Sequence, residues 1–337
     1  MTNAPTQRTL EFTPLTGTGL QTSELQFGTW RFGRVNETGE TEIDESRAHA
    51  LLDAYADAGG RYIDTADVYG GGSCERWIGE WLAERDRERY TIASKIFWQI
   101  RDGDPNSRGT NRKNVRDRID ALLDRLDTDY VDVLYIHRWD DQTDARELMK
   151  TLDGLVESGR VHYLGASTHR PNAWKVARAN EIARANGWEP FTVLQPRYNL
   201  VDREIEGDYL AFARQQGLAV CPWSPLGQGF LTGKYDRDAD VPADSKVAAS
   251  RRFRESYLTP ENFDVHEELN AVAAAVDATP AQVALAWLCH RDGVTAPIVG
   301  ARTVEQLHEN LAAASIDLSP AQVDRLTAAK AGPYDGL

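Results

Sequence analysis

The 337-residue chain has few cysteines and no long apolar run. Its three cysteines, Cys74, Cys221 and Cys289, show no C-x-x-C spacing, so we expect neither a zinc site nor a disulfide framework. The predicted compartment is therefore the cytoplasm. No stretch of about 18 apolar residues is present, so we expect no membrane span. The polar N-terminus lacks the apolar segment of a signal peptide.

Positive charge is also scarce. The chain has 38 Lys and Arg against 52 Asp and Glu, a net charge of 38 − 52 = −14 at pH 7. A nucleic-acid partner needs a basic face, so we expect none. Lysines number 7, which leaves 38 − 7 = 31 arginines. This acid-rich, lysine-poor composition favours an origin in a salt-adapted organism, with a GC-rich genome as the alternative explanation.

Short apolar runs alternate with amphipathic stretches along the chain. We expect strands at residues 25–28, 61–64, 90–95, 131–137, 161–165, 192–195, 218–221 and 296–300. We expect helices at residues 46–58, 73–84, 114–126, 148–156, 174–185, 209–215 and 304–313. The alternation predicts an α/β fold, a parallel eight-stranded (β/α)8 TIM barrel. A doubly wound sheet is the alternative, but the turn from Gly28 to Gly33 is not G-x-G-x-x-G.

The chain divides into a polar N-terminal segment, residues 1–14, and a single barrel domain, residues 15–337. Residues 15–25, with Gly17 and Gly19 between short extended pieces, are expected to form a hairpin across the bottom of the barrel. Long polar connections follow the third and seventh strands, at residues 101–112 and 227–260. Both are expected on the face where the strands end, and loops of this length are usually functional.

Titratable side chains come at the ends of three neighbouring strands, where barrels of this kind place their active sites. Asp64 ends the second strand, Lys95 the third and His137 the fourth, and Tyr69 lies in the loop after Asp64. An ammonium beside a phenol lowers the pKa of the phenol, and a carboxylate keeps the ammonium charged. An imidazole orients a carbonyl by hydrogen bonding. Each residue alone is as well explained by packing or a structural ion pair, but together the four predict proton donation.

The order and spacing of several motifs resemble the aldo-keto reductase family over nearly the whole chain. The motifs are Gly28-Thr29-Trp30, residues 62–70, Ser94-Lys95, His137, Gly165-Ala166-Ser167, Gln195, Ser224-Pro225-Leu226, residues 231–235, residues 300–303 and Glu309-Asn310. Residues 224–235 are similar to the branch that holds potassium-channel β-subunits, aryl-alcohol dehydrogenase-like proteins and general-stress reductases.

The resemblance implies reversible reduction of aldehydes or ketones to alcohols, with no metal. Tyr69 would donate the proton, Lys95 would lower the pKa of Tyr69, Asp64 would anchor Lys95, and His137 would steer the carbonyl. The substrate pocket is expected from Trp30, Tyr69, Trp98, His137 and Trp139, with a small carbonyl or alcohol as the substrate. The protein is expected as a monomer or a homo-oligomer.

The same resemblance implies NADPH or NADP as the cofactor, with NADH as an alternative. The implied cofactor-binding residues are Gly28, Thr29, Trp30, Asp64, Ser167, Thr168, Gln195, Trp223, Ser224, Pro225, Leu226, Gln228, Lys234, Gly300, Arg302, Gln306, Glu309 and Asn310. The Arg302 guanidinium suits a 2′-phosphate. Gln306, however, stands where many relatives have a second basic residue, and Thr168 where the family commonly has Asn.

Two other functions are weighed against the reductase. The first is an NADP(H)-binding regulatory or sensor protein that resembles channel β-subunits, with incidental turnover. The second is a metal-dependent isomerase, which the chain disfavours because no carboxylates cluster at its expected strand ends. The intact set of Asp64, Tyr69, Lys95 and His137 favours the enzyme.

Overall fold

The computed structural model describes residues 9–36, 39–168, 173–237 and 250–332. Its centre is a parallel sheet of eight strands, which confirms the predicted TIM barrel. The strands are β3 (Gln26–Gly28), β4 (Tyr62–Asp64), β5 (Thr91–Ile96), β6 (Val131–Ile136), β7 (Val161–Thr168), β8 (Phe191–Pro196), β9 (Ala219–Val220) and β10 (Ile298–Val299). The order in the sheet is β10-β3-β4-β5-β6-β7-β8-β9, so neighbours in sequence are neighbours in space.

Backbone hydrogen bonds between the segments around β9 and β10 close the barrel. Thr295 N–H donates to the Val220 carbonyl and Ile298 N–H to the Pro222 carbonyl, both at 2.8 Å. All eight strands run in the same direction, so their carboxyl ends meet at one rim.

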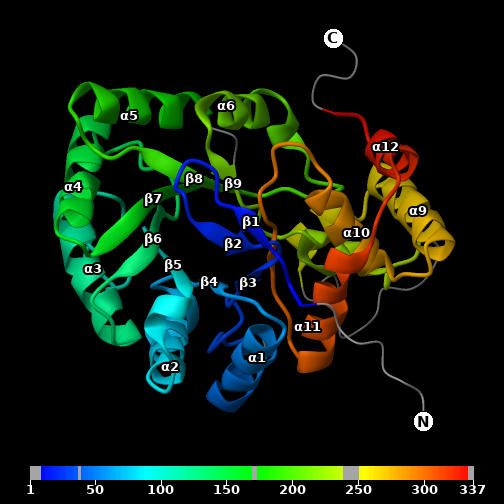
Figure 1. Ribbon diagram of the computed structural model, residues 1–337, viewed down its shortest axis with the longest axis horizontal. Helices are drawn as coiled ribbons and strands as arrows, with labels where there is room; N and C mark the ends of the chain where they lie inside the picture. The colour runs from blue at the N-terminus through cyan, green and yellow to red at the C-terminus, as the bar shows by residue number, and fades with distance from the viewer. Residues whose placement is uncertain (1–8, 37–38, 169–172, 238–249, 333–337) are drawn as a thin grey trace.

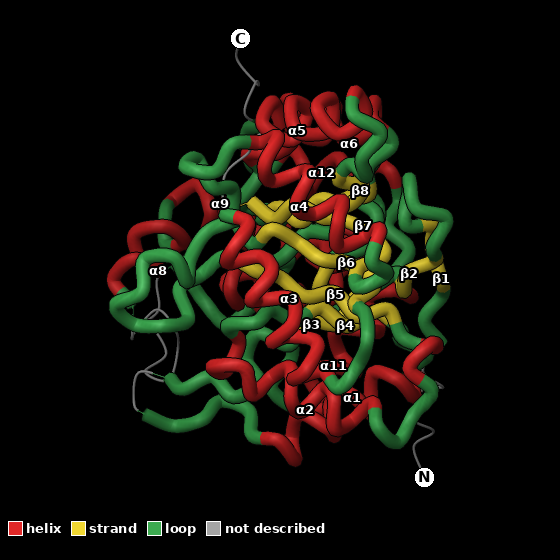
Figure 2. The backbone as a smooth tube through the Cα atoms, turned by 90° about the vertical axis from the view of Figure 1, so that its left-hand side faces the viewer, coloured by secondary structure: helices red, strands yellow, loops and turns green. Residues whose placement is uncertain are grey.

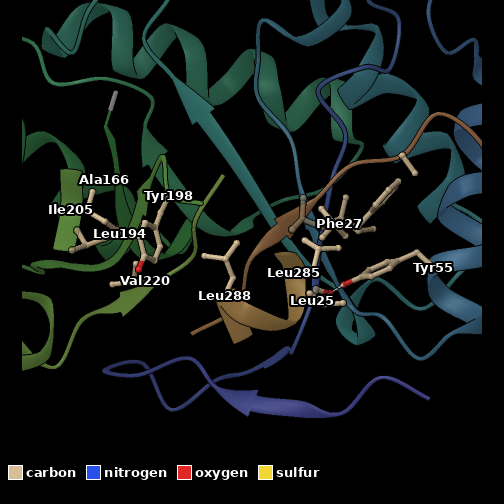
Figure 3. Packing of buried hydrophobic residues seen from close by; sticks show 14 of the residues in the cluster. Leu25, Phe27, Tyr55, Ala166, Leu194, Tyr198, Ile205, Val220, Leu285 and Leu288 are labelled. Atoms are coloured by element: carbon tan, nitrogen blue, oxygen red, sulfur yellow. Dashed lines mark hydrogen bonds between the residues drawn. The ribbon is translucent and has the colours of Figure 1, made fainter. Parts of the chain in front are cut away.

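Helices surround the strands, as Figure 1 shows. They are α1 (Glu45–Asp57), α2 (Ser73–Leu82), α3 (Arg112–Leu126), α4 (Ala145–Glu157), α5 (Ala173–Ala185), α6 (Asp208–Gln216), α8 (Arg251–Tyr257), α9 (Pro260–Ala275), α10 (Pro280–Cys289), α11 (Val304–Leu311) and α12 (Pro320–Ala328). Apolar side chains between strands and helices form the larger core, and in Figure 3 Phe27 of β3 meets Tyr55 of α1. The Tyr55 hydroxyl donates to the Leu25 carbonyl at 2.9 Å, which satisfies its buried polar atom.

An antiparallel hairpin plugs the bottom of the barrel, as predicted. Its strands are β1 (Phe12–Pro14) and β2 (Gln21–Ser23), so it begins before residue 15. Leu15 packs into the barrel interior with Tyr62 and Tyr135, in the smaller of the two cores. Figure 2 shows the hairpin at one end of the barrel and α8 at the other. The strand exits therefore lie at the end opposite the hairpin.

Helices α8, α9, α10 and α12 were not among the expected helices. Three of them begin with the same signal, a Ser or Thr cap followed by proline: Thr259-Pro260, Thr279-Pro280 and Ser319-Pro320. In the part of the chain that the structure describes, no single helix is long and apolar enough to cross a membrane. Helices α9 and α10 pass such a test only as a pair, and their axes differ by 95°.

Candidate active site

A buried ion pair lies at the exits of β4 and β5. Lys95 Nζ donates to Asp64 Oδ1 at 2.5 Å and to the Thr65 carbonyl oxygen at 2.7 Å. The two charged side chains are 1% and 5% exposed. Gln195 of β8 donates its amide to Asp64 Oδ2 at 2.7 Å. Each buried charge therefore has an opposite charge and further hydrogen bonds, without which burial of an ion pair is very costly.

Tyr69 opens a 3-10 helix, η1 (Tyr69–Gly72), directly after β4. Its hydroxyl oxygen lies 3.5 Å from Lys95 Nζ, so the ammonium has an acceptor for each of its three N–H bonds. Gly70 has a φ of +55°, and a Cβ there would stand 2.6 Å from the Phe32 carbonyl oxygen. Only glycine permits this tight turn, which holds the phenol beside the end of β5.

The surroundings of Tyr69 favour the protonated form of its phenol. Burial, and after it the Asp64 carboxylate, raises the pKa of Tyr69 well above its usual value. Burial also raises the pKa of Asp64, although Lys95 opposes the rise. The lowering of the Tyr69 pKa by Lys95, which the resemblance implies, stays a prediction. The phenol holds its proton at neutral pH, which is the state that a general acid needs.

Aromatic rings line the rim beside Tyr69. His137 follows β6, and its backbone N–H donates to the Ile96 carbonyl at 3.0 Å. Its ring stands edge-on to Tyr69 at 5.9 Å and to Trp98 at 6.0 Å between centroids. Tyr69, His137 and Trp98 therefore form one aromatic wall. Of the other pocket residues expected from sequence, Trp30 is 41% exposed, whereas Trp139 is half-buried and packs against the larger core.

The residues expected at the nicotinamide end surround Asp64. The Thr29 hydroxyl donates to the Asp64 carbonyl oxygen at 2.9 Å, and the Ser167 hydroxyl to the Gln195 carbonyl at 3.0 Å. A Cβ at Gly28 would stand 2.8 Å from the Ile298 side chain, so this exit of β3 has no room for one. The backbone of Thr168 ends β7, and its side chain lies outside the described residues. The Gln195 side-chain amide donates a hydrogen bond to the Asp64 carboxylate, a contact that the sequence did not reveal.

The loop after β9 contains backbone of unusual conformation. Ser224 and Gln228 are not glycines, yet both have a φ of +57°. Such residues cost about 1–3 kcal/mol each and cluster at ligand clamps. Asn199 Nδ2 donates to the Ser224 carbonyl at 2.9 Å, and Gln228 N–H donates to Ser224 Oγ at 3.2 Å, so the loop is held in place. The other expected residues of this loop differ in burial: Pro225 is buried, Trp223 and Leu226 are half-buried, and Lys234 is exposed.

The residues expected at the adenosine end lie around the N-terminus of α11. Gln306 Oε1 accepts from Arg302 N–H at 3.0 Å, and Asn310 Nδ2 donates to the Gly300 carbonyl at 3.2 Å. Arg302, Gln306 and Glu309 are exposed. Arg31, which sequence reasoning missed, lies nearby: burial, and after it the Arg302 guanidinium, lowers the pKa of Arg31. The Arg31 guanidinium pairs with the Glu42 carboxylate.

A second buried charge network, also missed from sequence, lies behind the aromatic wall. Arg118 of α3 pairs with Asp67, and Arg125 of α3 pairs with Glu75 of α2. The Ser94 hydroxyl, beside Lys95 on β5, donates to Glu75 Oε1 at 2.6 Å. The sequence contains a signal for this network, because α2 and α3 each place a charged residue on their apolar face, Glu75 and Arg118 respectively.

Comparison with known proteins agrees with this geometry. A model described as the aldo/keto reductase family matches residues 24–331. The chain is 33% identical over 328 residues to a norsolorinic acid reductase from Aspergillus flavus, covering 94% of this chain and 79% of the relative. It is 34% identical over 314 residues to an aryl-alcohol dehydrogenase from Pestalotiopsis microspora, covering 91% and 78%. It is 35% identical over 317 residues to the aldo-keto reductase ausK from Emericella nidulans, again covering 91% and 78%.

Proposed function

The chain belongs to the aldo/keto reductase family and is an oxidoreductase, and from this premise we propose that it reduces aldehyde or ketone carbonyls to alcohols with NADPH. The observation that carries the proposal is the contact of Lys95 Nζ with both the Asp64 carboxylate and the Tyr69 hydroxyl. A phenol that keeps its proton, beside an ammonium that stabilises the phenolate once the proton has left, is a proton donor for a forming alkoxide.

The residues of the rim fit a nicotinamide dinucleotide. The exposed cations Lys234 and Arg302 suit its phosphates, and the strained Ser224–Gln228 loop has the character of a ligand clamp. Lys234, Arg302 and the Ser224–Gln228 loop would hold this group, which when bound would supply the hydride for the carbonyl carbon. His137 donates a hydrogen bond that orients the carbonyl oxygen, and Tyr69 gives its hydroxyl proton to that oxygen. Lys95, anchored by Asp64, stabilises the resulting phenolate.

Aromatic carbonyls are the substrate class that the pocket favours. Tyr69, His137 and Trp98 offer ring faces and edges within 5.9 and 6.0 Å of one another, and aromatic rings pack well in such arrangements. The name of one relative, an aryl-alcohol dehydrogenase, supports the aromatic class, and the name of another, a norsolorinic acid reductase, supports a reductase.

The three cysteines, Cys74, Cys221 and Cys289, carry free thiols. Free thiols fit the cytoplasmic compartment that we propose for this protein.

The test is NADPH consumption with a panel of aromatic and aliphatic aldehydes, at low and at multi-molar KCl. Turnover that disappears in a Tyr69→Phe variant supports the reductase, and its salt dependence tests the adaptation suggested by the composition. NADPH binding without turnover in either salt would overturn the reductase in favour of the sensor. Absence of NADPH binding would remove the proposed cofactor.

The pH dependence of carbonyl reduction follows from the raised pKa of Tyr69. A general acid acts while protonated, so kcat falls only when the pH rises through its pKa. An ordinary phenol titrates near 10, so we expect kcat to stay flat between about pH 7 and about pH 9. The measurement is kcat at saturating NADPH and aldehyde across this range. A fall centred near pH 8 would mean that Lys95 lowers the pKa of Tyr69 after all.

Replacement of Arg302 tests the preference for NADPH over NADH. Because a charged hydrogen bond to phosphate is lost, Arg302→Ala should weaken NADPH binding by about tenfold or more. NADH lacks the 2′-phosphate, so its dissociation constant should change by less than about twofold. Arg291→Ala serves as a control for loss of a guanidinium elsewhere, since Arg291 pairs with Glu206. Equal losses of NADPH and NADH affinity in Arg302→Ala would show that Arg302 does not select the cofactor.

A further inference from the structure

Arg118 occupies a position where packing alone calls for an apolar side chain. It lies on the inner face of α3 among Val115, Ile119 and Leu122, and it is 1% exposed. Burial of a charged pair costs several kcal/mol per ion, and a well-packed apolar replacement is often neutral or stabilising. The presence of a guanidinium here therefore needs an explanation other than core packing.

The Arg118 guanidinium joins three separate segments. Its Nε and Nη2 atoms contact Asp67 Oδ2, in the segment between β4 and η1. Its Nη1 atom donates to the Trp98 carbonyl oxygen at 2.8 Å and lies 3.4 Å from the Ser107 carbonyl oxygen. Five N–H donors in one rigid plane make such a junction possible, and no other side chain offers them.

Asp67 ties this junction to the proton donor. Its backbone N–H donates to the Lys95 carbonyl at 3.2 Å, and Tyr69, two residues later, donates its own N–H to the Ala66 carbonyl at 3.0 Å. The Asp67 side chain is fully buried, and its Oδ1 atom has no hydrogen-bond partner among the described residues. Arg118 is therefore the group that holds this carboxylate in place, and a shift of Asp67 moves the Tyr69 turn.

The electrostatic surroundings make Asp67 dependent on Arg118. The pKa of Asp67 is raised to about 7, chiefly by burial and also by the nearby Glu75 carboxylate, although Arg118 and Arg125 lower it. Without the Arg118 guanidinium, the buried carboxylate would take up a proton or leave its present place.

We propose that Arg118 is a positioning residue, whose guanidinium fixes the turn that carries Tyr69 against the segment that carries Trp98. The inference rests on the proposed function, in which Tyr69 donates the proton and Trp98 lines the substrate pocket. The junction sets the distance between the proton donor and the wall against which the carbonyl substrate lies. A misplacement of about 1 Å in such a site lowers the rate by up to about 10²-fold.

Arg118→Lys separates positioning from charge neutralisation. Lysine keeps a cation beside Asp67 but lacks the planar fork that also reaches the Trp98 carbonyl. We expect Arg118→Lys to keep most of the thermal stability and to lower kcat by about tenfold or more. KM for NADPH should change by less than about twofold. Arg118→Met, which also leaves Asp67 unpaired, should lose both stability and kcat.

A matched control is available at the other end of the same strands. Arg87 Nη2 donates to Asp132 Oδ2 at 2.8 Å, the Asp132 carboxylate also accepts from Ile92 N–H, and the two charged side chains are 16% and 13% exposed. Arg87→Met removes an Arg–Asp pair of similar kind at the start of β5, far from the strand exits. We expect it to lower Tm but to leave kcat within about twofold, measured well below Tm.

Amide hydrogen exchange gives a second measurement that does not depend on turnover. Arg118→Lys should speed exchange in residues 66–72 and 97–109 and leave the rest of the barrel as in the wild type. Wild-type kcat and wild-type exchange in Arg118→Lys would overturn the proposal, as would a kcat loss no larger than that of Arg87→Met. If the wild type itself does not turn over aldehydes, the proposed function fails, and exchange still decides whether Arg118 holds the Tyr69 turn.

Discussion

Tyr69→Phe should lower kcat for carbonyl reduction by about 10²–10⁴-fold, which is the range expected for loss of a general acid. The substitution removes only the hydroxyl, so the edge-on packing of the ring against His137 at 5.9 Å is kept. In the wild type the Tyr69 hydroxyl lies 3.5 Å from Lys95 Nζ, which is a long contact. The hydrogen bonds of Lys95 to Asp64 and to the Thr65 carbonyl remain in the variant. The fold and the binding of NADPH should therefore be preserved, and the loss should fall on kcat.

The measurement is steady-state kinetics with an aromatic aldehyde, together with NADPH fluorescence titration and thermal unfolding. Tyr130→Phe is a matched control, since Tyr130 lies just before β6, at the opposite end of the barrel, and its ring packs on His162. It should retain wild-type turnover. Turnover of Tyr69→Phe within about tenfold of the wild type would remove Tyr69 from the role of proton donor.

Lys95→Met should both destabilise the protein and abolish turnover. The substitution leaves the Asp64 carboxylate buried without its counter-charge, and breaking a buried ion pair costs about 3–5 kcal/mol. Turnover falls as well, because no ammonium remains to stabilise the Tyr69 phenolate. Chemical denaturation and kinetics at one pH measure the two losses. Wild-type stability in Lys95→Met would show that the pair does not hold the exits of β4 and β5 together.

The stability loss in Lys95→Met should depend on pH with a definite sign. Burial already raises the pKa of Asp64 in the folded protein, and removal of Lys95 raises it further. A carboxyl whose pKa is raised on folding favours the folded state below its unfolded pKa, and this contribution is lost as the pH rises through the folded pKa. The deficit relative to the wild type should thus be smallest near pH 4 and grow toward pH 8.

The double variant Asp64→Asn/Lys95→Met separates the two effects. Neutralising the stranded carboxylate should recover much of the free energy of unfolding and flatten its pH dependence. Turnover should not return, because the ammonium is still missing. Recovery of activity in the double variant would contradict the role given to Lys95.

Much of the fold could be predicted because its signals are local. Each strand of the barrel shows a short apolar run in the sequence. Asp64 ends β4, Lys95 is the last residue but one of β5, and His137 directly follows β6. Apolar periodicity does not indicate helices α9, α10 and α12, although each begins with a capped proline. The signal for them was therefore in the sequence, in the caps rather than in the periodicity.

The buried charges show where prediction from sequence stopped. Arg118 stands on the apolar face of α3, and Glu75 on that of α2, so a mismatch between residue type and position is visible in each helix. The mismatch does not show which residue forms the ion pair with each buried charge. Asp67 lies 51 residues from Arg118 along the chain, and only the packing of α3 behind the Tyr69 turn brings the two together.

The sequence by itself determined the barrel and the identity of the residues at its rim, because strand alternation and residue order are local properties and parallel strands end at one edge. The tertiary structure decided the burial, the hydrogen bonds and the charge partners of those residues. It placed the Tyr69 hydroxyl beside Lys95 Nζ, paired the Gln195 amide with Asp64 and joined Arg118 to the Trp98 carbonyl. These features depend on burial and on side chains from distant segments, so their energies are set only once the chain is packed.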